Sequence, residues 1–278
     1  MRKRSRRWTI LVALLLVYTA VMSFGGCADR LLLHPSTNHA DAGRAVARFI
    51  GGGGRRLEIF TARSPAAADH EPEAFVLEFC GNATRAEHIT QFVADRWKDH
   101  PVEVWVMNYP GFGRSDGPAT LASIPPAALA TYDELKRVAG ERPIFLAGNS
   151  MGACPALHVA SQRACAGLIF QNPPPLRRLI LARHGWWNLW LVALPVAMQV
   201  PVELNALDTA PRVSAPAVFI IGERDTLVPP AYQRLIVAAY RGPRQVIALP
   251  TVGHWESLPP EAEQELRRAI DQLWQGKR

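Results

Sequence analysis

Most of the chain alternates between short apolar runs and longer segments in which apolar residues recur every three or four positions. The short runs predict buried strands at 75–79, 102–107, 144–147, 167–170, 217–221 and 245–249. The longer segments predict helices at 84–98, 126–138, 153–161, 231–240 and 261–274. Because strands that alternate with helices are typical of parallel sheets, we expect an α/β fold with a mainly parallel sheet and helices on both faces.

Three features modify this pattern. Residues 44–60 predict a hairpin with the glycine run 51–54 at its tip. Thr84 and Glu87 have the spacing of a capping box and predict the start of the first helix after the hairpin. The segment 173–213 lacks a regular period and contains three tryptophans followed by a nearly uncharged run. We expect this insert to form an apolar lid over a site or to lie on a membrane surface; the alternative is that it packs on the body of the domain.

The amino end has the layout of a secretory signal or membrane anchor. Five of the first seven residues are Arg or Lys, and the apolar stretch 8–24 follows them. Two glycines precede Cys27, as in bacterial lipoprotein signals, in which the cysteine becomes the lipidated first residue of the mature chain. Phe24 departs from the aliphatic residue that such signals usually carry at that position. An uncleaved anchor helix and an ordinary cleaved signal are the alternatives, and all three place the body outside the cytoplasm.

The chain thus divides into a signal or anchor at 1–27, a polar linker at 28–43, and one domain at 44–278 with a cap insert at about 173–213. Without the basic residues of the amino end, 26 basic residues face 24 acidic ones, so the body is nearly neutral and a nucleic-acid partner is not expected. No pair among the four cysteines has a metal-ligand spacing, so we expect no metal site and no cofactor. If Cys27 is lipidated, at most one disulfide can form.

A Gly-x-Ser-x-Gly motif, residues 148–152, lies between the strand 144–147 and the helix 153–161. This arrangement predicts a nucleophile elbow, in which Ser150 sits on a strained turn. Glycines two residues to either side avoid collisions with the neighbouring strand and helix. The turn exposes the serine hydroxyl and directs the amide of Met151 toward an oxyanion. By itself the motif is also compatible with a plain strand-to-helix turn.

The residues that activate a nucleophilic serine are expected at the carboxyl ends of other strands, because open α/β sheets bind ligands at that edge. Asp225 follows the strand 217–221, and His254 follows the strand 245–249. The order Ser150, Asp225, His254 predicts a triad in which His254 is the general base and Asp225 orients it. Glu223 is the alternative acid, and capping of the next helix is the alternative role of Asp225.

An oxyanion hole needs a second donor besides the amide of Met151. The loop 80–83, which follows the strand 75–79, is the expected source. The backbone amide of Asn82 is the candidate in this loop, with Gly81 allowing the chain to approach closely. The alternative for the loop is an ordinary strand-to-helix turn.

Taken together, the motifs resemble those of α/β-hydrolases, and within that superfamily those of the membrane-associated Bem46-like serine hydrolases. The matching segments are 81–83, 109–117, 148–152, 222–225 with 228–229, and 253–254. Cys80 stands where such families usually have His. The resemblance implies hydrolysis of an ester or thioester through an acyl-enzyme. A serine peptidase, or a catalytically idle membrane-tethered binding protein on the same fold, is the alternative.

These features set the expected partners and location. We expect a small-molecule or lipid-like ester as substrate and membrane association through the amino end. The expected location is the cell envelope, with the catalytic domain outside the cytoplasm.

Overall fold

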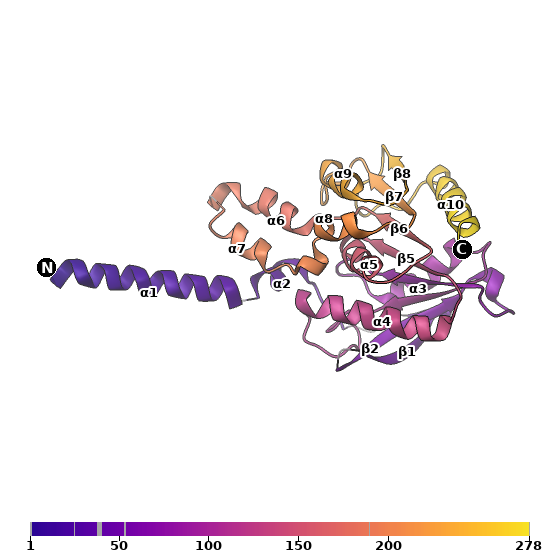
Figure 1. The fold of residues 1–278 in the computed structure, drawn as a ribbon, viewed down its shortest axis with the longest axis horizontal. Coiled ribbons are helices and arrows are strands. Elements are labelled where there is room, and N and C mark those ends of the chain that lie inside the picture. The colour runs from indigo at the N-terminus through magenta and orange to yellow at the C-terminus, as the bar shows by residue number, and fades with distance from the viewer. Residues whose placement is uncertain (1, 25, 38–40, 53, 189, 278) are drawn as a thin grey trace.

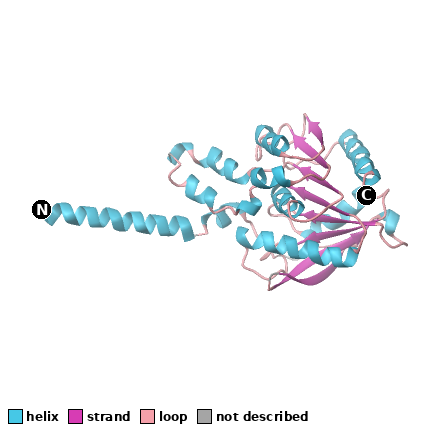
Figure 2. Ribbon diagram, in the orientation of Figure 1, coloured by secondary structure: helices cyan, strands magenta, loops and turns pink. Residues whose placement is uncertain are grey.

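The computed structural model describes residues 2–24, 26–37, 41–52, 54–188 and 190–277. Eight strands form one sheet in the order β1-β2-β4-β3-β5-β6-β7-β8 (Figures 1 and 2). The strands are β1 (Val46–Gly52), β2 (Arg55–Arg63), β3 (Ala74–Phe79), β4 (Val102–Met107), β5 (Ile144–Asn149), β6 (Gly167–Gln171), β7 (Ala217–Gly222) and β8 (Arg244–Leu249). Each predicted strand is present, with its ends within two residues of those expected.

The sheet is parallel except at one edge. β1 pairs antiparallel with β2, which confirms the predicted hairpin, and β2 pairs antiparallel with β4. Gly53, in the expected tip, lies outside the described residues. From β4 to β8 every neighbouring pair is parallel. The carboxyl ends of β3, β5, β7 and β8 therefore meet at the same edge, which is where chemistry is expected in such a sheet.

Helices cover both faces of the sheet, as the alternating pattern predicts (Figure 1). They are α3 (Ala86–Arg96), α4 (Ile124–Ala139), α5 (Ala153–Ala160), α9 (Pro230–Ala239) and α10 (Pro260–Gln275). On one face, Trp97 after α3 packs against Phe145 of β5, and Phe145 stacks on Trp274 of α10. The helices α4, α5 and α9 cover the opposite face, with α5 against β3 and β5.

The predicted capping box at the start of α3 is wrong. The residue before the helix is Arg85, one position later than expected, and its side chain makes no capping hydrogen bond. Instead, the side chain of Asn108 accepts a hydrogen bond from the amide of Ala86 at 2.8 Å. Glu87 is buried, and its carboxylate pairs with Arg85 at 3.1 Å and accepts a bond from Asn108. A tertiary contact thus satisfies the orphan amide that a local cap was expected to satisfy.

The amino end contains two helices, α1 (Arg2–Phe24) and α2 (Cys27–Leu32). Among the residues that the structure describes, no helix combines the length and apolar character needed to cross a membrane. The predicted linker 28–43 differs from the observed structure, because α2 occupies its start and Ala28 and Leu33 are buried in the core. Residues 38–40 of that linker lie outside the described residues.

The insert between β6 and β7 is helical and projects from the sheet beside α1 and α2 (Figure 1). It contains α6 (Leu176–His184), α7 (Ala193–Met198) and α8 (Ala206–Thr209), together with 3₁₀ turns at Trp186–Asn188, Val202–Leu204 and Ala210–Arg212. Further 3₁₀ turns lie at Pro65–Ala67, Leu121–Ser123 and Ser150–Gly152. We refer to residues 173–213 as the cap.

Part of the cap packs on the body of the domain, which was the alternative expected for it, and part of it is exposed. Val196, Ala197, Val200 and Leu204 are buried against the core. Large apolar side chains on the outer side remain exposed, and Trp186 has 71% of its surface accessible. The large exposed apolar residues of the cap include Trp186, Trp187, Trp190, Leu191, Leu194 and Met198.

Candidate active site

The turn after β5 has the geometry of a nucleophile elbow. Ser150 adopts a φ of 51°, in the left-handed region that side chains rarely enter. A Cβ on Gly148 would lie 2.4 Å from the carbonyl oxygen of Gly152, and a Cβ on Gly152 would lie 2.0 Å from the carbonyl oxygen of Phe79. Both glycines are therefore required sterically, as the motif predicts. This tight turn places Ser150 between β5 and α5, at the carboxyl edge of the sheet.

Asp225 and His254 form a buried pair at the same edge. Asp225 lies in the loop after β7, and His254 in the loop after β8. The Nδ1 atom of His254 is 2.7 Å from Oδ2 of Asp225, and the side chain of Asp225 is fully buried. Because this bond engages Nδ1, the other ring nitrogen, Nε2, is the one available for proton transfer with a nucleophile.

Three further hydrogen bonds hold Asp225 in place. Its Oδ1 accepts from the amides of Leu227 and Val228, at 2.8 and 2.7 Å. Its Oδ2 accepts from Nε2 of Gln233 at 3.1 Å, in addition to the bond with His254. Asp225 thus caps the turn before α9, the alternative role named for it, and contacts the imidazole at the same time. These bonds fix the orientation of the carboxylate toward His254.

Glu223, the alternative acid, is placed elsewhere. Its carboxylate pairs with the guanidinium of Arg234 on α9. The structure therefore brings Asp225, and not Glu223, to His254.

The loop after β3 lies next to the elbow. A Cβ built on Gly81 would be 3.7 Å from Cβ of Ser150, so the loop passes close to the serine. The side-chain oxygen of Asn82 accepts hydrogen bonds from the amides of Ala83 and His34, at 3.0 and 3.1 Å. These bonds fix the loop that carries the Asn82 amide, while Met151 lies in the 3₁₀ turn that enters α5.

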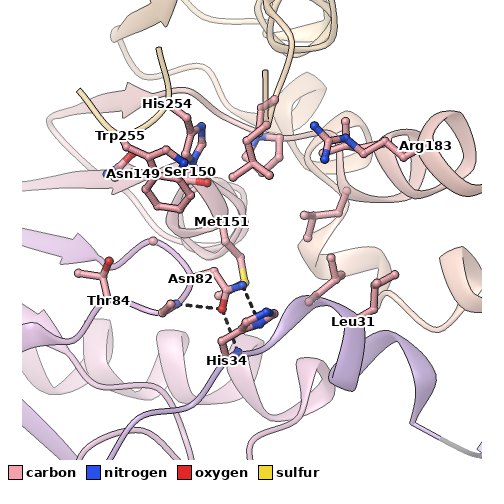
Figure 3. Close-up of a pocket in the computed structure, with 18 of the residues that line it drawn as sticks. Leu31, His34, Asn82, Thr84, Asn149, Ser150, Met151, Arg183, His254 and Trp255 are labelled. Carbon is pink, nitrogen blue, oxygen red and sulfur yellow. Dashed lines mark hydrogen bonds between the residues drawn. The ribbon is translucent and has the colours of Figure 1, made fainter. Parts of the chain in front are cut away.

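A cavity of about 540 Å³ connects these elements. This volume is in the range typical of small-molecule sites. Figure 3 shows Ser150 and His254 together at one end, with Arg183 and Leu31 at the other. Asn82, Met151 and Trp255 also line the cavity, and the edge of Trp255 packs on the ring of His254 with centroids 4.7 Å apart.

The walls away from Ser150 are mainly apolar and come from two segments. Leu176, Leu179 and Ile180 belong to α6 of the cap, so this part of the cap covers the site. Leu31, Leu32 and His34 belong to α2 and the chain after it. The sequence reasoning missed this second contribution, because 28–43 was assigned to a linker. The apolar run 31–33 was the available signal, since a solvated linker has little reason to carry three leucines in a row.

The cysteines take no part in this arrangement. No disulfide joins Cys27, Cys80, Cys154 and Cys165, all of which lie in the described part of the chain. Burial raises the pKa of Cys154 to about 12, and burial also raises the pKa of Cys80 well above its usual value. Both therefore remain neutral at physiological pH, where a nucleophilic cysteine must be a thiolate. The hydroxyl of Tyr109 donates to the backbone carbonyl of Cys80, so the position usually held by His contributes a main-chain contact.

Comparison with known proteins agrees with the fold and the motifs. The model of the alpha/beta hydrolase family matches residues 79–200, which include the elbow and much of the cap. A Pyrococcus furiosus esterase superposes with a TM-score of 0.66 at 17% identity, over 88% of this chain and 97% of the esterase. The chain has the α/β-hydrolase fold. A monoacylglycerol lipase of Paleococcus ferrophilus shares it, with a TM-score of 0.58 and 18% identity over 78% of this chain and 99% of the lipase.

Two curated relatives match over a shorter length. An uncharacterised protein of Mycobacterium tuberculosis is 27% identical over 155 residues, which is 55% of this chain and 53% of that protein. An uncharacterised membrane protein of Saccharomyces cerevisiae is 24% identical over 175 residues, 57% of this chain and 56% of the yeast protein. The chain thus spans about half the length of the curated relatives it matches. The resemblance to α/β-hydrolases is confirmed, and the membrane description of the yeast relative fits the Bem46-like pattern.

Proposed function

We propose that the protein is a serine hydrolase that cleaves a carboxylic ester or thioester through an acyl-enzyme. The observation that carries this proposal is the buried hydrogen bond between Asp225 and His254, whose imidazole lines the same cavity as Ser150. The strained φ of Ser150 supports it, because such strain is retained where it positions a reacting group.

In the proposed mechanism, Nε2 of His254 takes the proton of Ser150 as the hydroxyl oxygen attacks the carbonyl carbon. Asp225 keeps the Nδ1 proton in place and stabilises the imidazolium that forms. The amides of Met151 and Asn82 donate to the oxyanion. The imidazolium then protonates the leaving alkoxide or thiolate. Water repeats these steps on the acyl-enzyme and releases the acid.

The substrate that this site favours has an apolar acyl part. The walls formed by Leu176, Leu179 and Ile180 bring apolar surface to the reacting serine. The esterase and the lipase that share the fold act on ester bonds, which favours an ester or thioester over a peptide. A serine peptidase is the second enzymatic candidate, and an idle binding protein is the candidate of another class.

A fluorophosphonate probe and p-nitrophenyl esters separate these candidates. We expect the full chain to be labelled and to hydrolyse the esters, and Ser150→Ala to abolish labelling. Ser150→Ala and His254→Ala are each expected to lower turnover by several orders of magnitude, with the double variant little worse than either, because the pair acts as a unit. Ser161→Ala, at the end of α5, is the control. Normal turnover by Ser150→Ala contradicts the assignment, and peptide hydrolysis without ester hydrolysis favours the peptidase.

The proposal includes membrane association through the amino end, with the catalytic domain outside the cytoplasm. Three observations support it. The cap helix α7, which carries the exposed Leu194 and Met198, lies beside α1 (Figure 1). In the chain that still carries α1, the hydroxyl of Tyr18 donates to the carbonyl of Leu191, one of these exposed residues. The basic residues at 2–7 precede the apolar stretch, as in exported proteins. Cys27, at the start of α2, is the proposed site of lipidation.

A further inference from the structure

The segment Cys27–Ser36, predicted as a linker, is fastened to the catalytic domain at four separate points. The amide of Ala28 donates to the side chain of Gln199 in the cap at 3.0 Å. Asp29 accepts from the amide of Leu121 at 2.7 Å, in the turn before α4. These contacts join the start of the segment to two parts of the domain that are about 90 and 170 residues away in sequence.

The end of the segment is fastened at the reacting edge of the sheet. The amide of His34 donates to the side chain of Asn82, in the proposed oxyanion loop, at 3.1 Å (Figure 3). The carbonyl of Ser36 accepts from the amide of Gly113 at 2.9 Å. Leu33, between these contacts, is buried. The segment is therefore held in one position relative to Ser150, although it precedes the sheet and belongs to none of its layers.

Between these fixed points, two leucines enter the catalytic cavity. Leu31 and Leu32 line it opposite the helix α6, whose Leu179 and Ile180 line it from the cap. Leu31 is directed into the cavity in Figure 3, at the end away from Ser150. The space between the two helices is bounded mainly by leucine and isoleucine side chains, with the nucleophile at one end and Arg183 at the other. Its apolar middle matches an extended hydrocarbon chain better than a polar head group.

We propose that Leu31 and Leu32 of α2 are specificity-determining residues that form one wall of the acyl-binding site. The inference rests on the proposed function and narrows its substrate class to esters with a medium or long acyl chain. The acyl chain lies between α2 and α6, and the leaving group departs on the side of His254. Burial of each methylene against this wall favours longer chains.

The test compares hydrolysis of p-nitrophenyl decanoate and p-nitrophenyl acetate by the full chain. Leu31→Trp fills the far end of the cavity, and Leu31→Lys introduces a charge there. Each is expected to lower the ratio of kcat/KM for decanoate over acetate at least about tenfold, the change expected when about two methylenes lose apolar contact. Leu31 is 40% exposed, so both substitutions are tolerated by the fold.

The matched controls are Leu235→Trp and Leu235→Lys on α9. Leu235 is 37% exposed and does not line the cavity, so the ratio is expected to stay within about twofold of the wild type. An unchanged ratio in both Leu31 variants of an active enzyme overturns the inference alone. An equal fall in the Leu235 controls overturns it too. A wild-type chain that hydrolyses neither ester and takes no fluorophosphonate removes the proposed function, and the inference with it.

Discussion

Replacing Asp225 by Asn tests the proposed triad most directly, because the hydrogen bonds around this residue determine how the introduced amide must be oriented. Oδ1 of Asp225 accepts from two backbone amides, of Leu227 and Val228, which remain donors in the variant. The carbonyl oxygen of the introduced side chain must therefore occupy the Oδ1 position. Its NH₂ group then occupies the Oδ2 position, facing Gln233 and His254.

The reversed amide is worse, because it sets NH₂ against two fixed N–H donors. In the favoured orientation, the NH₂ group opposite Nδ1 of His254 forces that nitrogen to act as acceptor. The ring proton then resides on Nε2, which cannot take a proton from Ser150. We expect kcat to fall on the order of 10⁴-fold, the effect known for this substitution in a protease triad and equivalent to about 5 kcal/mol of transition-state stabilisation.

The assay is turnover of p-nitrophenyl butyrate by the full chain, with thermal unfolding measured to confirm that each variant is folded. Glu223→Gln is the control, since Glu223 contacts Arg234 and not the imidazole. An exposed ion pair of this kind contributes little, so activity is expected within about threefold of wild type. Turnover by Asp225→Asn within about tenfold of wild type refutes the tautomer argument. A larger loss in Glu223→Gln would mean that the acid lies two residues earlier.

Three more predictions concern stability and processing. Gly152→Ala is expected to lower the free energy of unfolding by about 3 kcal/mol or more, because its Cβ would lie 2.0 Å from the carbonyl oxygen of Phe79. Gly51→Ala is the control: a Cβ there would meet no atom within 4 Å, so the same thermal or urea titration should show a change of less than about 0.5 kcal/mol. Burial raises the pKa of Glu78 to about 7, against the opposing effect of a nearby arginine, so the folded state binds the proton more tightly than the unfolded one. Stability should then fall as the pH rises from about 4.5 through 7, and Glu78→Gln should remove up to roughly 3 kcal/mol of that fall; identical pH profiles in urea titrations would contradict this. Mass spectrometry of the membrane-extracted protein should find a mature chain beginning at a lipid-modified Cys27, with Cys27→Ser blocking processing; an unmodified thiol with residues 2–26 attached leaves a signal anchor, and a shortened chain without lipid leaves ordinary cleavage.

Sequence reasoning located the regular elements closely because their signals are local. A strand such as β4 is a short, mainly apolar run. In a helix such as α10, the buried apolar residues recur every three or four positions. The candidate site followed from topology, since parallel strands bring the loops with Ser150, Asp225 and His254 to one edge whatever their distance in the chain. The choice of Asp225 over Glu223 as the acid could be ranked from sequence, but the side-chain directions that separate them could not.

The pattern and order of residues thus determined the layers, the elbow and the edge at which the triad candidates meet. The tertiary structure alone decided what surrounds them. The start of α3 is capped by Asn108, 22 residues away, and the wall of the cavity is completed by α2, which the sequence assigned to a linker. Such contacts join segments that are far apart in the chain. A short polar or apolar run shows that a residue will be exposed or buried, but it does not show which distant segment it will contact. The position of α2 arises from bonds such as that between His34 and Asn82, which exist only after the sheet has brought the two segments together.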